Sequence, residues 1–211
     1  MTTDQLITAI AADAAPSRPF DHSFRYAAAI GIASAGIIFF SAIGPRPDLA
    51  AALDTWRFLL KFVITVPLAI TATMVVLGMS RPDTWNRYRS FPLMVPLVLL
   101  AIAAVLELSV VPRSLWMVRL IGSNSVNCMT LIPLLAIIPL AAFLTVLRRG
   151  APRDPGTTGA AAGLAAAAIA ASFYAINCFD DSPLFVITWY PLATSIVAAC
   201  GYLLGRSILR W

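Results

Sequence analysis

Six long apolar stretches fill most of the length of this chain. A helix needs about 20 mainly apolar residues to cross a hydrocarbon core about 30 Å thick. Only 12% of the residues are charged, whereas a soluble domain carries about 25%. The sequence therefore predicts an all-α polytopic membrane protein. Its six transmembrane helices are expected near 26–43, 56–79, 91–111, 128–147, 158–177 and 183–205.

Basic residues are concentrated in alternate segments between these stretches. One set comprises Arg18, Arg25, Arg81, Arg87, Arg89, Arg148, Arg149, Arg153, Arg206 and Arg210. The intervening segments carry Arg46, Arg113 and Arg119, with Arg57 and Lys61 near the start of the second stretch. Because cytoplasmic loops are enriched in arginine and lysine, both termini are expected in the cytoplasm. Scattered loop arginines form no basic face, which argues against direct nucleic-acid binding.

Residues 1–22 are expected to form a cytoplasmic segment in front of a transmembrane domain at 23–211. Thr2 and Gln5 fit a helix capping box, so a short amphipathic helix should begin there. A helix of about twelve residues is marginal alone in water and becomes ordered when its apolar stripe meets a surface. We expect this stripe to bind a cytoplasmic protein through Leu6, Ile7, Ile10 and Asp13.

The alternatives for this segment are a helix that lies on the membrane and a frayed tail. Such helices usually carry a polar face rich in lysine and arginine. No lysine or arginine precedes Arg18, which favours the protein partner.

Two cysteines are predicted to lie at similar depth on the outer side of the membrane. Cys128 begins the fourth stretch and Cys178 ends the fifth, and a short inner loop makes these helices antiparallel neighbours. They could form a disulfide if their Cα atoms come within about 7 Å. They could also bind a soft metal ion with Asp180 and Asp181 as oxygen ligands. Two buried structural thiols are the alternative. Cys200, deep in the last stretch, is interpreted as a packing residue.

Two further features within the stretches are ambiguous. Glu107 is an acid near the end of the third stretch, and intramembrane acids are often functional. Its position favours contact with the interface, or pairing with Arg113 or Arg119, over a proton relay. Gly159 and Gly163 match the small-residue pattern of closely packed membrane helices, although a buried alanine-rich helix would look the same.

The sequence contains no constellation for catalysis, such as a Ser-His-Asp set, a phosphate-binding loop or H-E-x-x-H. We therefore expect a protein that is not an enzyme. A membrane thiol oxidoreductase that reduces a quinone is one rival, but the chain lacks C-x-x-C. A small transporter is another, but few polar residues would line a path through the membrane.

Several segments together resemble a known family. They are Asn127–Met129, Leu147–Pro152, Cys178–Phe185, Trp189–Tyr190 and Gly205–Trp211. This pattern, which extends over nearly the whole chain, is similar to that of the NrsF family. Members of that family are six-span proteins of the bacterial inner membrane that act as anti-sigma factors. Phe179 departs from the pattern, because we expect proline there more often.

The resemblance implies both a partner and a signal. The N-terminal segment would hold an extracytoplasmic-function (ECF) sigma factor at the membrane. Whether the inner-loop residues Arg148 and Arg149 share in this contact is left open by the sequence. The family's two cysteines match Cys128 and Cys178, which implies that these thiols sense metal or oxidative stress. No cofactor is expected, apart from a heavy-metal ion bound transiently by this pair.

Overall fold

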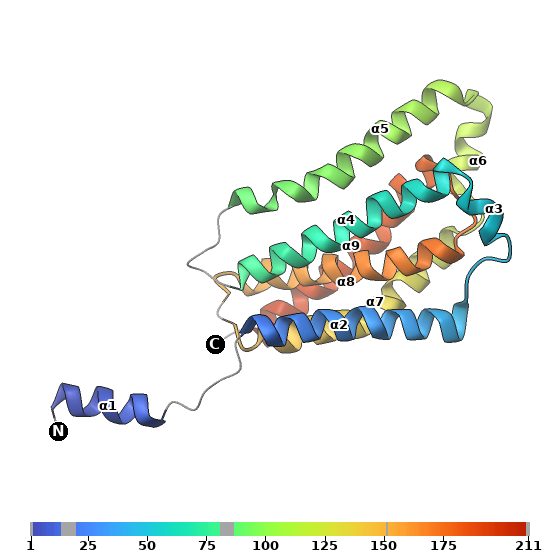
Figure 1. The fold of residues 1–211 in the computed structure, drawn as a ribbon. Coiled ribbons are helices and arrows are strands. Elements are labelled where there is room, and N and C mark those ends of the chain that lie inside the picture. Colours follow the sequence, from blue (N-terminus) through green and yellow to red (C-terminus); the bar gives the residue numbers. More distant parts are fainter. Residues whose placement is uncertain (1, 14–19, 81–86, 151, 210–211) are drawn as a thin grey trace.

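The computed structural model describes residues 2–13, 20–80, 87–150 and 152–209. The described residues are helical or lie in short connections, and no strand occurs among them (Figure 1). The α-helices are α1 (Thr3–Asp13), α2 (Phe20–Ile38), α3 (Leu49–Leu53), α4 (Trp56–Met79), α5 (Met94–Val110), α6 (Trp116–Ile121), α7 (Ser125–Leu147), α8 (Pro155–Asn177) and α9 (Pro183–Ile208). A π-helical turn (Phe39–Ile43) extends α2, and 3-10 turns (Arg87–Leu93 and Arg113–Leu115) precede α5 and α6.

Six helical segments within the described part of the chain are long and apolar enough to cross a membrane. They are Phe20–Ile43, Trp56–Met79, Ser90–Val110, Arg113–Leu147, Pro155–Asn177 and Pro183–Ile208. The predicted fold class is therefore confirmed: the chain is an all-α polytopic protein with a short N-terminal helix before six spans. Prolines occur inside α4, α7 and α9, as expected where neighbouring helices replace the lost hydrogen bonds.

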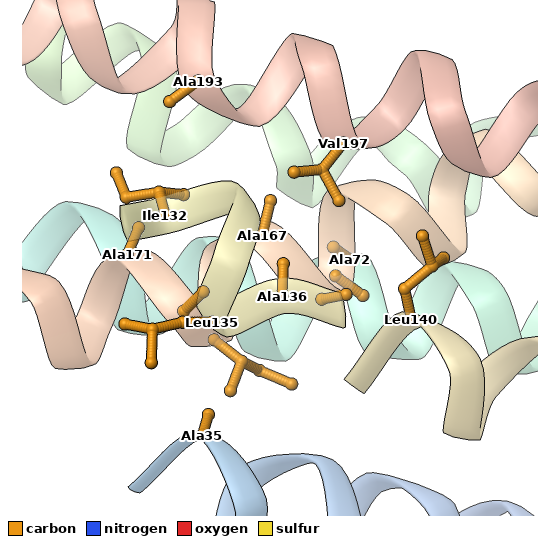
Figure 2. Close-up of a cluster of buried hydrophobic side chains, with 14 of the residues drawn as sticks. Ala35, Ala72, Ile132, Leu135, Ala136, Leu140, Ala167, Ala171, Ala193 and Val197 are labelled. Carbon is orange, nitrogen blue, oxygen red and sulfur yellow. The ribbon is translucent and has the colours of Figure 1, made fainter. Parts of the chain in front are cut away.

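Helix α8 is the most deeply buried of these spans and packs against α9, α4 and α7. Helix α2 lies at one edge against α7, and α5 lies at the opposite edge beside α4 and α9 (Figure 1). Small side chains let the central helices approach closely. Ala167 and Ala171 of α8 meet Ile132, Leu135 and Ala136 of α7 in the core (Figure 2).

The contact between α8 and α9 relies on glycine in both helices. A Cβ atom on Gly159 would collide with the carbonyl oxygen of Gly201, and one on Gly163 would meet that of Val197. Gly205 lies equally close to the backbone of α8. Both interpretations of the fifth stretch therefore hold, because α8 is an alanine-rich buried helix and its glycine pair also packs on α9. The matching pair in α9, Gly201 and Gly205, was not identified from the sequence.

Local sequence signals fix the start of both helices. Asp154 caps α8 by accepting hydrogen bonds from the backbone N–H groups of Gly156 and Thr157, and a proline follows the cap. Ser182 caps α9 in the same way and is also followed by proline. Because α8 ends at Asn177 and the Ser182 cap begins α9, the loop between them contains only residues 178–182.

The start of α2 and the end of α9 lie at the same end of the bundle, and α1 stands apart beyond that end (Figure 1). We call this end, which carries the α7–α8 loop (148–154), the arginine end. The opposite end, which carries the α8–α9 loop (178–182), is the thiol end. Which end faces the cytoplasm stays a prediction. Arg18, Arg81, Arg210 and Trp211, which took part in the sequence argument, lie outside the described residues.

The expectation that Cys200 is a packing residue inside the bundle is wrong. Cys200 is exposed on α9, where it faces the groove between α7 and α9. Hydrophobic character alone cannot distinguish the two faces of a membrane helix, because lipid is as apolar as a protein core.

Candidate functional site

The thiol end is organised around the α8–α9 loop. Cys178 caps the end of α8, and Cys128 lies in the first turn of α7. Both side chains are fully buried and both are free thiols. They lie close enough to each other to interact electrostatically. The structure thus places the two predicted sensor thiols together beneath the loop.

Two tyrosines enclose the thiols. The rings of Tyr174 and Tyr190 lie 6.2 Å apart, and their hydroxyl groups interact electrostatically with both cysteines. The Tyr174 hydroxyl donates to the carbonyl oxygen of Asn124 at 3.4 Å. The Tyr190 hydroxyl is buried and forms no hydrogen bond of standard geometry within the described part of the chain. The thiols are therefore buried next to two tyrosine hydroxyl groups.

The Cys178 thiol is buried and protonated, which lowers its reactivity. Burial raises its pKa, and the nearby ammonium group of Lys61 opposes that shift only partly. Its Sγ donates a hydrogen bond to the carbonyl oxygen of Asp180 at 3.7 Å. Because the thiolate is the nucleophile and the metal ligand, a buried protonated thiol reacts slowly. Cys178 is therefore expected to react slowly while its thiol stays buried.

Lys61 connects the loop to α4. This lysine is 1% exposed, and its ammonium group contacts Asp181 Oδ1 at 2.5 Å. It also donates to the carbonyl oxygen of Cys178 at 2.8 Å. A charge removed from water needs a paired partner of this kind. The sequence places Lys61 near the start of a span, but its partner is more than a hundred residues away in the chain.

Arg46, which lies before α3, is the second cation that binds the α8–α9 loop. Its guanidinium group contacts Asp181 at 2.9 Å and Asp48 at 2.7 Å, and it donates to the carbonyl oxygen of Cys178. It also lies 4.8 Å from the centre of the Phe179 ring, in a cation–π arrangement. The hydrogen bond from Arg46 lowers the pKa of Asp48. The Phe179 ring therefore covers this cation.

Asp180 fixes the loop to the start of α7. Its Oδ2 accepts hydrogen bonds from the backbone N–H groups of Ser123 and Asn124 at 2.8 and 2.7 Å. The side chains of both residues also donate to it. The preceding residue, Gly122, has φ = 60°, and a Cβ atom there would collide with Asp180 and Phe185. Glycine is required at this position for both reasons.

Glu107 joins α5 to the same loop. Its carboxylate pairs with Arg119 at 2.6 Å and with Arg57 at 3.5 Å. It also accepts a hydrogen bond from the Ser182 hydroxyl at 2.7 Å. Pairing with Arg119 was one of the alternatives expected from the sequence, and the structure confirms that alternative. Glu107 therefore neutralises nearby arginines and holds the beginning of α9.

The predicted metal co-ligands are already engaged. Asp180 binds backbone N–H groups, and Asp181 pairs with Lys61 and Arg46. Among the described residues, no three His, Cys, Asp or Glu side chains gather as a metal site. A metal ion would have to displace these contacts to gain oxygen ligands.

The other predicted site residues lie at the arginine end or beyond it. Leu6 and Ile7 are exposed on α1, being 44% and 59% exposed. Ile10 and Asp13 belong to the same helix, but their side chains lie outside the described part of the structure. Arg148 and Arg149 follow α7 and are both exposed. The structure therefore separates these residues from the thiols by the length of the bundle.

Comparison with known proteins identifies the family of this chain. A family model described as "NrsF: Negative regulator of sigma F" matches residues 10–211. The chain belongs to the NrsF family. A probable anti-sigma-F factor NrsF from Azospira oryzae is 35% identical over 216 aligned residues, which cover all of both chains. The anti-sigma-F factor NrsF from Caulobacter vibrioides is 30% identical, also over the full length of both. No solved structure matches the chain.

Proposed function

We propose that this chain is a membrane-bound anti-sigma factor that sequesters an ECF sigma factor at the bacterial inner membrane. The observation that carries the proposal is similarity over the full length to two proteins named as anti-sigma-F factors. Full-length similarity matters because the N-terminal segment and the membrane domain are both represented in those relatives. The proposal assigns no catalytic step to the chain.

The contact with the sigma factor is assigned to α1. The capping box predicted from the sequence is closed, since Thr2 N donates to Gln5 Oε1 at 3.0 Å and Gln5 N donates to Thr2 Oγ1 at 3.4 Å. Leu6 and Ile7 therefore project from a helix with a defined start, and both are exposed. An exposed apolar stripe on a short helix suits insertion into a hydrophobic groove of a partner.

The signal is assigned to Cys128 and Cys178. An oxidant would take two electrons from the thiol pair, which would form one disulfide and release two protons. A soft metal ion would instead displace the two thiol protons and bind both sulfurs. Either product needs the enclosed thiols to open, so it would alter the α8–α9 loop and its contacts with Lys61 and Asp180. Repacking of the spans would then release the sigma factor at the other end.

Co-purification from membranes tests the partner. Full-length protein should capture a sigma factor, and a form lacking residues 2–20 should lose it. The paired change Leu6→Ser and Ile7→Ser should have the same effect, because it removes the apolar stripe without shortening the chain. Thr8→Ala, on the opposite face of α1, is the matched control and should retain the partner. If no sigma factor is captured by the full-length form, the proposed function is wrong.

A double substitution tests the sensor separately. Cys128→Ser with Cys178→Ser should abolish release of the sigma factor under metal or oxidative stress while leaving binding at rest intact. Cys200→Ser is the control, since this exposed thiol lies away from the loop. An unchanged stress response in the double variant would eliminate the thiol mechanism and leave the anti-sigma function standing.

A further inference from the structure

The arginine end of α7 carries two neighbouring arginines that face different grooves. Arg148 lines a groove between α7 and α9, and Arg149 lines a groove between α2 and α7. Both are exposed, and neither guanidinium group forms an ion pair or a hydrogen bond within the described part of the chain. Two positive charges at a membrane surface are thus left available for an external anion.

The groove between α7 and α9 is apolar below its arginine. It has a volume of about 420 Å³, and its lining includes Leu144, Leu204 and Ile208. It continues deeper along the same helices into a hollow of about 410 Å³. Ile137, Leu140 and Cys200 line both hollows, which therefore adjoin each other.

The groove between α2 and α7 likewise has an arginine at one end and a mainly apolar lining. Its volume is about 460 Å³, and the polar residues His22, Ser23 and Arg149 lie toward the arginine end of its two helices. Tyr26, Ile30 and Ile138 belong to its mainly apolar remainder. Each groove therefore combines a basic group at the membrane surface with an apolar channel that leads toward the middle of the membrane.

A low ridge separates the two grooves. Ala141 and Thr145 are exposed on α7 and line both of them. Along α7 one groove extends from Ile137 to Arg148 and the other from Ile138 to Arg149. Eleven residues of helix rise roughly 16 Å, which is about half of a hydrocarbon core roughly 30 Å thick. The two grooves thus match the depth of one leaflet.

We propose that this surface is a binding site for cardiolipin. One phosphate group would lie against Arg148 and the other against Arg149, with acyl chains in the grooves on both sides of α7. Basic pockets between transmembrane helices bind anionic headgroups in this way. An acidic protein surface could satisfy the arginines, but it would leave the apolar grooves within the membrane unfilled. The proposal is independent of the anti-sigma function and gives Arg148 and Arg149 a role other than binding the sigma factor.

Native mass spectrometry of the full-length chain in neutral detergent tests the headgroup contact. Cardiolipin should stay bound, whereas phosphatidylglycerol should bind more weakly and phosphatidylethanolamine more weakly still. Each basic residue near an anionic surface contributes about fivefold, so Arg148→Ala with Arg149→Ala should weaken cardiolipin binding about 25-fold. Arg153→Ala is the matched control, because Arg153 is exposed on the same loop and lines neither groove.

A second variant tests the grooves. Ala141→Trp would place a bulky side chain where the two grooves meet and would leave the arginines in place. This variant should also bind cardiolipin more weakly. Since Ala141 is exposed, the unfolding midpoint without lipid should stay close to that of the parent and so report correct folding. Bound cardiolipin should also slow modification of Cys200 by an apolar maleimide, because Cys200 lines the α7–α9 groove.

Four results would overturn the proposal. Equal losses for Arg153→Ala and the double arginine variant would indicate non-specific attraction. Equal affinities for phosphatidylglycerol and cardiolipin would show that the site does not recognise two phosphate groups. Unchanged cardiolipin binding by Ala141→Trp would show that the grooves do not hold the acyl chains. Loss of the sigma factor with unchanged lipid binding in the double arginine variant would assign these arginines to the protein partner.

Discussion

The two ends of the bundle arrange their charges in opposite ways. At the thiol end, Asp180, Asp181 and Glu107 are each bound by cations or backbone N–H groups from other segments. At the arginine end, Arg148 and Arg149 are exposed and have no acidic partner among the described residues. The first arrangement joins the α8–α9 loop to α4 and α5 and to the segments before α3 and α7, whereas the second presents charge to the surroundings.

This difference separates structural charges from binding charges. Lys61 is almost completely buried, so its loss should change the stability of the whole bundle. The exposed arginines should contribute little to stability, because surface charges usually change it by no more than about 0.5 kcal/mol. The comparison therefore predicts large stability effects at one end and effects on binding at the other.

The largest effect is expected for Lys61→Met. Removing one member of a buried pair leaves an uncompensated charge and typically costs about 3 kcal/mol or more. Asp181 keeps Arg46, so the lower figure applies here. Denaturant unfolding of the purified chain in detergent measures the change, with Arg153→Ala from the arginine end as the control. Equal stability of the two variants would contradict the comparison.

Glycine substitutions at the thiol end should come next. Gly122→Ala combines an unfavourable backbone conformation with a collision against Asp180, and we expect a loss of about 2–3 kcal/mol. Gly44 also has a positive φ, of 77°, but a Cβ atom there meets nothing within 4 Å. Gly44→Ala should therefore cost about 1 kcal/mol from the backbone alone. If both variants lose the same amount in unfolding experiments, the close approach of Asp180 contributes nothing.

Asp154→Ala should have a moderate effect at the arginine end. Loss of an N-cap costs about 1 kcal/mol. The backbone N–H group of Thr157 contributes most to lowering the pKa of Asp154. The carboxylate thus stabilises the fold above the unfolded pKa of about 3.9, and this stabilisation is lost as the pH falls through the lower folded pKa.

Unfolding midpoints between pH 6 and pH 3 measure this dependence. The parent should lose more stability than Asp154→Ala over that range. Asp154→Ser keeps a capping oxygen without a charge, so it should retain stability at pH 6 and lack the pH-dependent part. A variant Asp154→Ala with the parent's pH profile would show that another carboxylate is responsible.

The smallest effect is expected for Asp48→Asn at the thiol end. The Asp48 side chain is 50% exposed, and Arg46 retains its contact with Asp181 when Asp48 is neutralised. The change in unfolding midpoint should be smaller than for Asp154→Ala and should shrink further in high salt, because exposed pairs are screened. A larger loss than that of Lys61→Met would show that Asp48, rather than Asp181, is the main partner of Arg46.

Much of the fold followed from local patterns in the sequence. Six apolar stretches predicted the six spans, and the Thr2–Gln5 capping box predicted the start of α1. The glycine pair of α8 indicated close packing, but its counterpart, Gly201 and Gly205, was missed. Two small residues in one helix do not identify the partner helix, because the lipid and the other helices are equally apolar.

The candidate site was predicted only in part. The proximity of Cys128 and Cys178 was predicted, because the fourth and fifth stretches are antiparallel and nearly equal in length. Their outer ends therefore lie at similar depth. The partner of Lys61 could not be predicted, because Asp181 lies 120 residues further along the chain and several acids were available. Cys200 was misplaced because apolar sequence does not distinguish a lipid-facing surface from the interior.

Patterns along the chain were sufficient to predict the number of membrane spans, the capping of α1 and the family to which the chain is similar. These properties depend on residues that are near one another in the chain, or on patterns that extend along it. The folded structure was needed to show that Lys61 and Arg46 meet at Asp181, and that Arg148 and Arg149 line separate grooves. Such contacts depend on which faces of different helices pack together, and that is fixed by side-chain packing across the whole bundle.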